Sequence, residues 1–360
     1  MKKSLLFKII LLANIVLFAG CNYNAEMASL KTLTKITDGV FYIEYEGDYK
    51  LAEYIDAGGG KTNDEMADYI TKCLKKGKWS GIGAGKNISV KITPPDFGCS
   101  SIVAENKNGG QICGRNFDWN DCSIIIIHTK PADGYESIST SCLEFLGLKR
   151  DWQPAYKFPN DMIALASIYV PLDGINEKGL YIADLMAGDD EETAQNTSKP
   201  DLTTTVAIRL ILDKAASVDE AVKLLEGIDM YSVIGSAHHF AIADASGKAV
   251  VVEYVNNQMY VTESKVLTNH YTAESPKKDD GSNPHKENSR ERLEKLLNAG
   301  EASAWKMNAE DVKNAMESVS AKEYDVDNSL TAWSITFEPE KQKATYYFRG
   351  DFEKPFVIEF

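Results

Sequence analysis

Stretches of alternating apolar and polar residues run along much of the chain and predict strands. The alternation in "DGVFYIEYEGDY", near residue 40, predicts one strand. Beyond residue 98, "SSIVAE", a turn at "NKNGG" and "QICGRNFDW" predict a hairpin, and "SIIIIHT" predicts a buried strand. Three strands joined by Ser-Gly and Asn-Asn turns are predicted in "HHFAIADASGKAVVVEYVNNQMYVT", and three terminal strands in "TAWSITFE", "KATYYFR" and "PFVIEF".

Apolar residues at helical spacing separate these strands. Val206, Leu210 and Ile211 recur at that spacing in "TTTVAIRLILDKAA". The next helix, "SVDEAVKLLEGI", is predicted to begin with a capping box formed by Ser217 and Glu220. Further helices are predicted in "EMADYITKCLKK", "SRERLEKLLNAG" and "NAEDVKNAME". Strand hairpins that alternate with pairs of helices predict an α+β fold, in which helices cover packed antiparallel sheets.

The first twenty residues have the composition of an export signal. Lys2 and Lys3 precede the apolar run "LLFKIILLANIVLFAG", which is too short and too interrupted for a membrane-spanning helix. The run ends in "LFAGC", which resembles a bacterial lipobox with Phe18 in place of the usual aliphatic residue. We therefore expect an exported lipoprotein, held at a membrane in the periplasm or at the cell surface by a lipid on Cys21. A plain secretory signal is the alternative.

Composition and charge narrow the class of protein. The chain has 360 residues, of which 44% are apolar and 26% charged, as in an ordinary globular protein. The net charge of −14 argues against a nucleic-acid partner. Six cysteines occur without a CxxC motif or a Cys/His cluster, so we expect neither a metal nor another cofactor. In an exported protein, three disulfide pairings are open to four of them, Cys73, Cys113, Cys122 and Cys142.

The regular pattern breaks directly before Cys99. The segment "TPPDFG" contains two prolines, which remove backbone donors and fix the backbone, so we expect an exposed, extended stretch that can be cut. The expected organisation is a signal peptide at 1–20, a lipid-anchored pro-segment at 21–98 and a catalytic domain at 99–360.

Cys99 is either a buried strand thiol or a nucleophile. A thiol nucleophile needs a nearby cation and a base that accepts its proton. Histidine is the usual base, but Cys99 lacks the flanking sequence of papain-like proteases. A cut between Gly98 and Cys99 would instead free an α-amine with a pKa of about 8, which can serve as the base.

From Cys99 onward the chain resembles the choloylglycine hydrolase family of linear amide C–N hydrolases, which includes bile salt hydrolases and penicillin V acylases. The pieces that carry the resemblance occur in the family's order: "GCSSIVAE", "GRNFDW", "PLDGINEKGLYIA", "TTTVAIRLILDKAASVDEAVKLL", "HFAIADASGKAVVVEY", "VLTNHY", "SRERL" and "TAWSITFE". The resemblance implies the four-layer αββα sandwich of N-terminal nucleophile hydrolases and autocatalytic processing. Members of the family often pair, so a homo-oligomer is a further expectation.

The resemblance also implies roles for individual residues. Cys99 is the nucleophile, Arg115 stabilises its thiolate, and Asp118 orients the freed α-amine. Asn269 helps to form the oxyanion hole, and Arg290 completes the charged cluster. Alternatives stay open for these residues. Arg115 and Asp118 can form a structural ion pair, Asn269 can cap a turn, and Arg292 can take the role given to Arg290.

Three residues are candidates for substrate binding. Met186 stands where several bile salt hydrolases carry an oxyanion asparagine, and its side chain cannot donate a hydrogen bond. Trp119 and Phe117 are candidates for lining an acyl pocket, although aromatic residues are more often part of a core. Tyr156 and Phe158 are weaker candidates for the same pocket.

Together these features predict an exported, self-processed amidase that cleaves a small-molecule N-acyl amide through a Cys99 thioester. Conjugated bile salts and penicillin V are examples of such amides. An acyltransferase on the same fold and a non-catalytic, ligand-binding lipoprotein are the alternatives.

Overall fold

The computed structural model describes residues 28–76, 98–155, 162–187, 192–233, 235–272, 284–321 and 330–360. The export signal, Cys21, Tyr156, Phe158 and the side chain of Cys73 lie outside the described residues. Within the described part, no helix is long and apolar enough to cross a membrane. Cys99, Cys113, Cys122 and Cys142 are buried free thiols.

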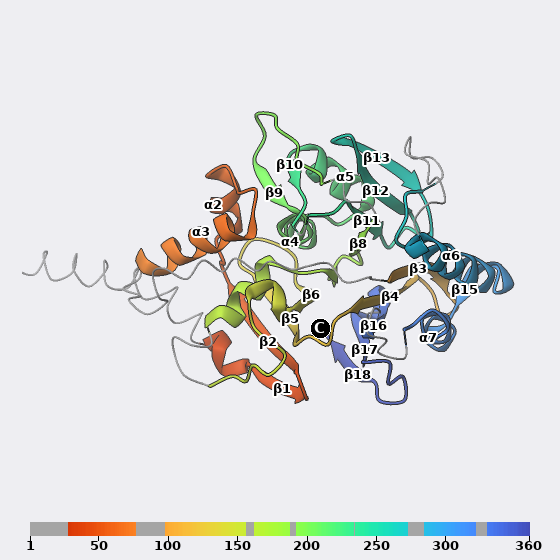
Figure 1. Cartoon of the computed structure of the whole chain (residues 1–360). Helices are drawn as coiled ribbons and strands as arrows, with labels where there is room; N and C mark the ends of the chain where they lie inside the picture. Colours follow the sequence, from red (N-terminus) through yellow and green to blue (C-terminus); the bar gives the residue numbers. More distant parts are fainter. Residues whose placement is uncertain are drawn as a thin grey trace, which may run out of the picture.

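A nine-stranded sheet forms one half of the molecule (Figure 1). Neighbouring strands pair antiparallel, except that β2 and β5 pair parallel. Its strands, in spatial order, are β1 (Thr34–Thr37), β2 (Val40–Gly47), β5 (Ile124–Pro131), β6 (Ser137–Cys142), β7 (Asp173–Asn176), β8 (Tyr181–Met186), β11 (His238–Ala243), β12 (Ala249–Val255) and β13 (Gln258–Glu263).

A seven-stranded sheet faces the first. Six of its strands, in spatial order, are β14 (Val266–Leu267), β3 (Cys99–Asn106), β4 (Gln111–Trp119), β16 (Leu330–Glu338), β17 (Lys343–Phe348) and β18 (Phe356–Glu359). The seventh strand, β15 (Lys306–Met307), also pairs with β3. A separate pair consists of β9 (Asp201–Thr203) and β10 (Asp229–Tyr231).

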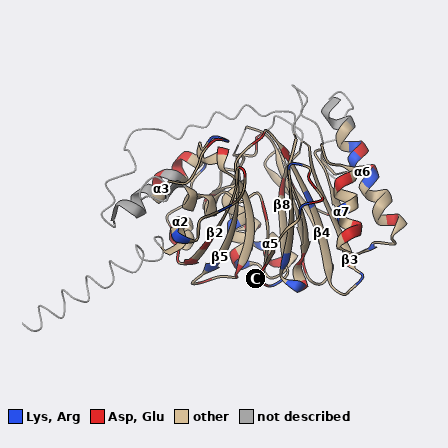
Figure 2. Cartoon of the chain, turned by 90° about the horizontal axis from the view of Figure 1, so that it is seen from below, with Lys and Arg blue, Asp and Glu red and all other residues tan. Residues whose placement is uncertain are grey.

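Helices cover the outer faces of both sheets, as Figure 2 shows for α6 and α7 beside β3 and β4. The helices are α2 (Leu51–Asp56), α3 (Asn63–Lys76), α4 (Thr204–Lys214), α5 (Val218–Glu226), α6 (Pro284–Ala302) and α7 (Ala309–Ser318), with 3₁₀ turns η1 (Leu143–Leu146), η2 (Met162–Tyr169) and η3 (Pro339–Lys341). One buried cluster joins the two sheets, a second joins α4 and α5 to the larger sheet, and a third joins α6 and α7 to the smaller one. The predicted α+β sandwich of four layers is therefore confirmed.

The local patterns predicted most elements correctly. The hairpin of β3 and β4 forms with Cys99 opposite Phe117, and β11, β12 and β13 form the predicted three-stranded run. The capping box of α5 forms only in part. The Ser217 hydroxyl accepts from the Glu220 amide, but the Glu220 carboxylate accepts from the amide of Ala216 instead of Ser217.

The segment before Cys99 is part of the larger sheet. Eight residues of β2 pair in parallel with β5, and Phe41 and Ile43 are fully buried in the cluster beneath the helices. The hydroxyl of Tyr49, just beyond β2, donates to Asp213 in α4. The expected boundary at residue 98 therefore stays a prediction about cleavage, because the described residues on both sides of it share one core.

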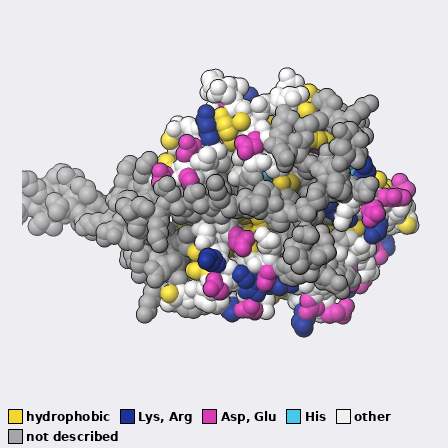
Figure 3. Space-filling view, in the orientation of Figure 1, with side chains coloured by type: hydrophobic (Ala, Val, Ile, Leu, Met, Phe, Trp, Pro, Cys, Tyr) yellow, Lys and Arg dark blue, Asp and Glu magenta, His cyan; other side chains and the backbone are white. Residues whose placement is uncertain are grey.

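Charges of both signs are interspersed on one face of the molecule. On the face shown in Figure 3, Lys and Arg side chains lie among Asp and Glu side chains wherever residues are described. The expectation that nucleic acid is not a partner stays a prediction from the net charge.

Candidate active site

The hairpin of β3 and β4 brings the predicted nucleophile and its two neighbours to one end of the smaller sheet. Cys99 opens β3 opposite Phe117, and the next residue of β4 is Asp118. The Asp118 amide donates to the carbonyl of Gly98 at 2.9 Å. Because side chains alternate along a strand, Arg115 points to the same face as Phe117 and Cys99, whereas Asp118 points to the other. The Gly98–Cys99 peptide bond thus runs between the two groups.

The Cys99 thiol is buried, with 4% of the residue exposed. Burial raises the pKa of this thiol, while the guanidinium of Arg115 beside it acts in the opposite direction. The thiol is therefore protonated near neutral pH in the uncut chain, and it needs a base to become a nucleophile.

A buried ion pair fixes Arg115. Its guanidinium donates to the carbonyls of Asn116 at 2.7 Å and Asp184 at 2.5 Å, and its Nε lies 3.6 Å from an oxygen of Asp173. The Asp173 carboxylate also accepts from the indole of Trp333 at 2.8 Å. The ion-pair partner of Arg115 is thus Asp173 on β7, instead of Asp118 as in the structural alternative. Asp173 was not among the residues predicted for the site, although it lies within the quoted piece "PLDGINEKGLYIA".

Asp118 is buried on the helix side of β4. Its carboxylate accepts from the hydroxyl of Thr331 at 2.6 Å, and Thr331 is its register partner on β16. Burial raises the pKa of Asp118 to about 6, although Arg292, Thr331 and Arg115 all favour its charged form. This carboxylate therefore changes charge close to neutral pH.

Asn269 holds the backbone of the nucleophile. Strand β14 pairs antiparallel with β3, and continuing its register places Asn269 beside Cys99. The Cys99 amide donates to Oδ1 of Asn269 at 2.5 Å, and the Nδ2 of Asn269 donates to the carbonyl of Met186 at 2.9 Å. In the uncut chain Asn269 thus contacts the nitrogen of the Gly98–Cys99 bond, and its predicted oxyanion role stays a prediction.

Arg292, the alternative to Arg290, contacts the backbone of the nucleophile. Its guanidinium donates to the carbonyl of Cys99, to the Ser100 hydroxyl at 2.9 Å and to Oδ1 of Asn269 at 3.0 Å. The reason is helical geometry: the buried residues of α6 recur as Ser289, Arg292 and Leu296, whereas Arg290 is half-buried. That spacing is present in the sequence and favours Arg292, the alternative that the sequence left open.

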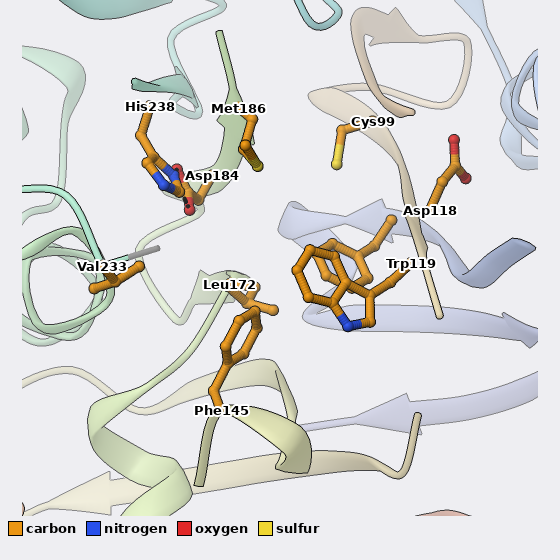
Figure 4. Close-up of a pocket in the computed structure, with 10 residues that line it drawn as sticks. Cys99, Asp118, Trp119, Phe145, Leu172, Asp184, Met186, Val233 and His238 are labelled. Atoms are coloured by element: carbon orange, nitrogen blue, oxygen red, sulfur yellow. Dashed lines mark hydrogen bonds and ion pairs between the residues drawn. The ribbon is translucent and has the colours of Figure 1, made fainter. Parts of the chain in front are cut away.

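A small pocket opens beside the thiol (Figure 4). The three predicted substrate-binding residues, Phe117, Trp119 and Met186, all line it. The remaining lining residues are Cys99, Asp118, Phe145, Leu172, Asp184, Val233 and His238. Most of this wall is apolar, so the pocket suits an apolar group attached to a carbonyl at Cys99.

Comparisons with known proteins find relatives of this chain. Residues 161–352 match the family model described as acyl-coenzyme A:6-aminopenicillanic acid acyl-transferase, a range that includes Asn269 and Arg292. The penicillin V acylase of Pectobacterium atrosepticum is 32% identical over 110 residues. That match spans 27% of this chain and only 29% of the length of the curated relative.

Solved structures also resemble this chain. A variant of the conjugated bile acid hydrolase of Clostridium perfringens superimposes with a TM-score of 0.52 at 16% identity, over 72% of this chain and 92% of that one. The penicillin V acylase of Agrobacterium tumefaciens gives a TM-score of 0.48 at 17% identity, over 72% and 84% of the two chains. The likeness to the Clostridium structure supports the fold of the N-terminal nucleophile hydrolases, which the sequence predicted.

Proposed function

Because the chain belongs to the acyl-coenzyme A:6-aminopenicillanic acid acyl-transferase family, we propose that it is an amidase with Cys99 as its nucleophile. It would cleave the linear C–N bond of a small N-acyl amide. The observation that carries this proposal is the convergence of four side chains from distant segments on the Gly98–Cys99 peptide: Arg115, Asp118, Asn269 and Arg292. A buried strand thiol needs no such surroundings.

The first proposed step is cleavage of the chain's own Gly98–Cys99 bond. The Cys99 thiol gives up its proton as its sulfur attacks the Gly98 carbonyl carbon. The C–N bond then breaks, and the proton is transferred to the nitrogen, which becomes the α-amine. Water then hydrolyses the resulting thioester and leaves a carboxylate on Gly98. The Asp118 amide, 2.9 Å from the Gly98 oxygen, supports this step because it can stabilise the negative charge that develops there.

The freed α-amine then acts as the base in each turnover. It accepts the thiol proton, and Arg115 stabilises the thiolate. The thiolate attacks the substrate carbonyl, the protonated amine gives its proton to the departing amine, and a thioester to Cys99 remains. Water hydrolyses that thioester and releases the acid. Oδ1 of Asn269 accepts from the Cys99 nitrogen and the Asp118 carboxylate lies beside Gly98, so both would hold the protonated α-amine.

The pocket and the relatives favour an apolar acyl group. The lining next to Cys99 is formed mainly by Phe117, Trp119 and Phe145 together with aliphatic side chains. The relatives are named for penicillin V and for conjugated bile acids, so amides of these kinds are the first substrates to assay. Export and a lipid on Cys21 are part of the proposal and are supported by the "LFAGC" sequence.

An acyltransferase is the second candidate, because the matching family model carries that description. In that reaction an amine, in place of water, would take the acyl group from the Cys99 thioester. Product analysis with and without an added amine distinguishes the two: the acid alone indicates hydrolysis, and a new amide indicates transfer.

Mass spectrometry and an amide panel test the proposal together. We expect a mature chain that begins at Cys99, and we expect Cys99→Ala to stay uncut and to hydrolyse none of the amides. Amide hydrolysis by an uncut wild-type chain would contradict the α-amine mechanism. Activity that survives in Cys99→Ala would contradict the choice of nucleophile.

A further inference from the structure

A histidine and a carboxylate form a buried pair in the pocket wall. His238 opens β11 opposite Met186 of β8, and its Nδ1 lies 3.0 and 2.9 Å from the two carboxylate oxygens of Asp184. Both residues are at most 5% exposed. Because a carboxylate only accepts hydrogen bonds, Nδ1 carries a proton, and Nε2 is the nitrogen left for another partner.

The Nε2 of His238 is buried and has no hydrogen-bond partner among the described residues. Other polar groups of the pocket wall are already engaged: the Trp119 indole donates to Glu144 at 3.0 Å, and Asp118 accepts from Thr331. Buried polar atoms are normally hydrogen-bonded, so an unpartnered one in a pocket indicates a place for a ligand atom.

His239, the next residue, has a similar carboxylate partner but lies outside the pocket. His239 is also fully buried, its Nδ1 lies 3.2 Å from Glu253, and its Nε2 also has no partner within the described part of the chain. It does not belong to the residues that line the pocket. A ligand in the pocket can therefore contact His238, which lines it, and not His239.

A hydroxyl group is the partner that fits His238 best. A hydroxyl can donate to Nε2 when the ring is neutral and accept from it when the ring is charged. A carboxylate fits only the charged ring and would lie close to the Asp184 carboxylate. An alkyl group leaves Nε2 buried without a hydrogen bond, which is unfavourable.

We infer that His238, oriented by Asp184, binds a hydroxyl group on the acyl part of the substrate. This inference rests on the proposed function, since it assigns the acyl group to this pocket. Figure 4 shows His238 and Asp184 on one side of the pocket, with Cys99, Asp118 and Trp119 on the other. The hydroxyl therefore lies away from the reacting carbonyl, and His238 determines specificity without touching the reacting atoms.

Matched substrates test the contact. The probes are pairs of N-acyl amides with the same chromogenic amine and acyl length, one ending in a methyl group and the other in a hydroxyl. We expect the wild type to prefer the hydroxyl member in kcat/KM by about tenfold or more, because its loss leaves a buried nitrogen unpaired. In His238→Leu the preference disappears, whereas His238→Gln, whose amide reaches the same place, retains part of it. An unchanged ratio in His238→Leu overturns the inference.

His239→Leu is the matched control. It removes the same kind of imidazole–carboxylate pair from the same strand, outside the pocket, so it should keep the wild-type ratio. If both leucine variants change the ratio equally, the effect is structural and the inference fails. If His238→Leu does not fold, His238→Gln and Asp184→Asn test the inference in its place. Both must then reduce the preference for the hydroxyl member of each substrate pair.

Binding to an inactive chain separates this inference from the proposed function. Cys99→Ala keeps the peptide before residue 99 as the structure has it, and calorimetry measures its affinity for the free hydroxy acid and for the plain acid. Tighter binding of the hydroxy acid, lost on adding His238→Leu, supports the contact even if no amide is hydrolysed. Equal binding of the two acids overturns it, even if the amidase activity is confirmed.

Discussion

At Gly98 the absence of a side chain lets the peptide approach the charged groups of the site. A Cβ at this position would lie 2.4 Å from Oδ2 of Asp118 and 3.3 Å from the guanidinium carbon of Arg292. Neither group can retreat freely, since both are buried and hydrogen-bonded. A side chain here would therefore displace the Gly98 carbonyl from the Cys99 thiol.

The first prediction follows for Gly98→Ala. The added methyl group should slow cleavage of the Gly98–Cys99 bond by about 100-fold or more, because misplacing reacting groups by about 1 Å has effects of this size. Intact-mass analysis over time measures it. Gly227→Ala is the control, because Gly227 ends α5 and its Cβ would meet two backbone oxygens of that helix, at 3.2 and 3.6 Å. Equal rates for both variants would contradict the role of Gly98.

The second prediction compares two arginines of one helix. Arg292→Lys loses the forked contacts to Cys99, Ser100 and Asn269, and a lysine cannot replace a planar group that donates in several directions. We expect cleavage and amide hydrolysis to fall at least tenfold. Arg290→Lys, two residues earlier, should stay within about threefold of wild type. The opposite order would restore Arg290 to the role first predicted for it.

The third prediction concerns pH and Asp118. Its pKa in the folded chain is about 6, above the ordinary value of 3.8, so its contribution to stability is complete below pH 3.8 and is lost as the pH rises through 6. Between these limits the free energy of unfolding should fall by up to about 3 kcal/mol relative to an Asp118→Asn variant. Urea titrations in a Cys99→Ala background measure this in the uncut chain. Parallel pH curves for the two proteins would show that the pKa is not raised.

The residues of the site that could be predicted from the sequence are those within one hairpin and those to which the family resemblance gave a role. Cys99, Arg115 and Asp118 follow from a single pair of adjacent strands. Asp173 and Thr331 were missed because their roles arise from register between strands that are far apart in the chain. His238 was read as the start of a strand, which is correct, but the sequence does not reveal which cavity its side chain lines.

At the scale of elements, the glycine of "GRNFDW" determines how closely α7 packs on β4. A Cβ on Gly114 would lie 2.7 Å from Val312 and 2.9 Å from Met316, both in α7. The neighbouring residue Asn116 ties the same helix to the strand by donating to the Met316 carbonyl at 2.7 Å. The motif therefore places glycine against α7 on one face of the strand and Arg115 beside the Cys99 thiol on the other.

The fourth prediction is that Gly114→Ala overpacks this contact. The methyl group forces α7 outward and should lower the free energy of unfolding by about 1–3 kcal/mol. Chemical denaturation measures the loss. Ala104→Gly, on the neighbouring strand β3, is a control that removes volume from the same cluster and should not displace the helix. A Gly114→Ala chain as stable as wild type would mean that α7 shifts without cost.

The type of each element was easier to predict than the identity of the element that lies beside it. Alternation indicates that "DGVFYIEYEGDY" is a strand, but it carries no information about which strand lies beside it. The structure pairs this segment in parallel with β5, more than eighty residues later in the chain. Pairings of that kind depend on the packing of the whole core, so the sequence could not show that the segment before the cleavage site belongs to the larger sheet.

At the scale of the whole molecule, cleavage at residue 98 would cut the chain without dividing the core. Strand β2 contributes a full row of backbone hydrogen bonds to β5 and buries Phe41 and Ile43. The fifth prediction is that the two fragments stay together after cleavage. They should co-elute in size-exclusion chromatography and separate only in denaturant. A catalytic fragment that elutes alone and remains active would contradict this.

The parallel pairing of β2 with β5 has a consequence for where the enzyme stays. With a lipid on Cys21, as proposed, the anchor and the nucleophile would belong to two different polypeptides after processing. Strand pairing alone would then retain the catalytic fragment at the membrane. Further proteolysis anywhere between α3 and β3 would not release the catalytic fragment. Mild denaturation would release it and leave the N-terminal fragment bound to the membrane by its lipid. The catalytic fragment would thus stay at the membrane because the fold is stable, and not because a covalent bond joins it to the lipid.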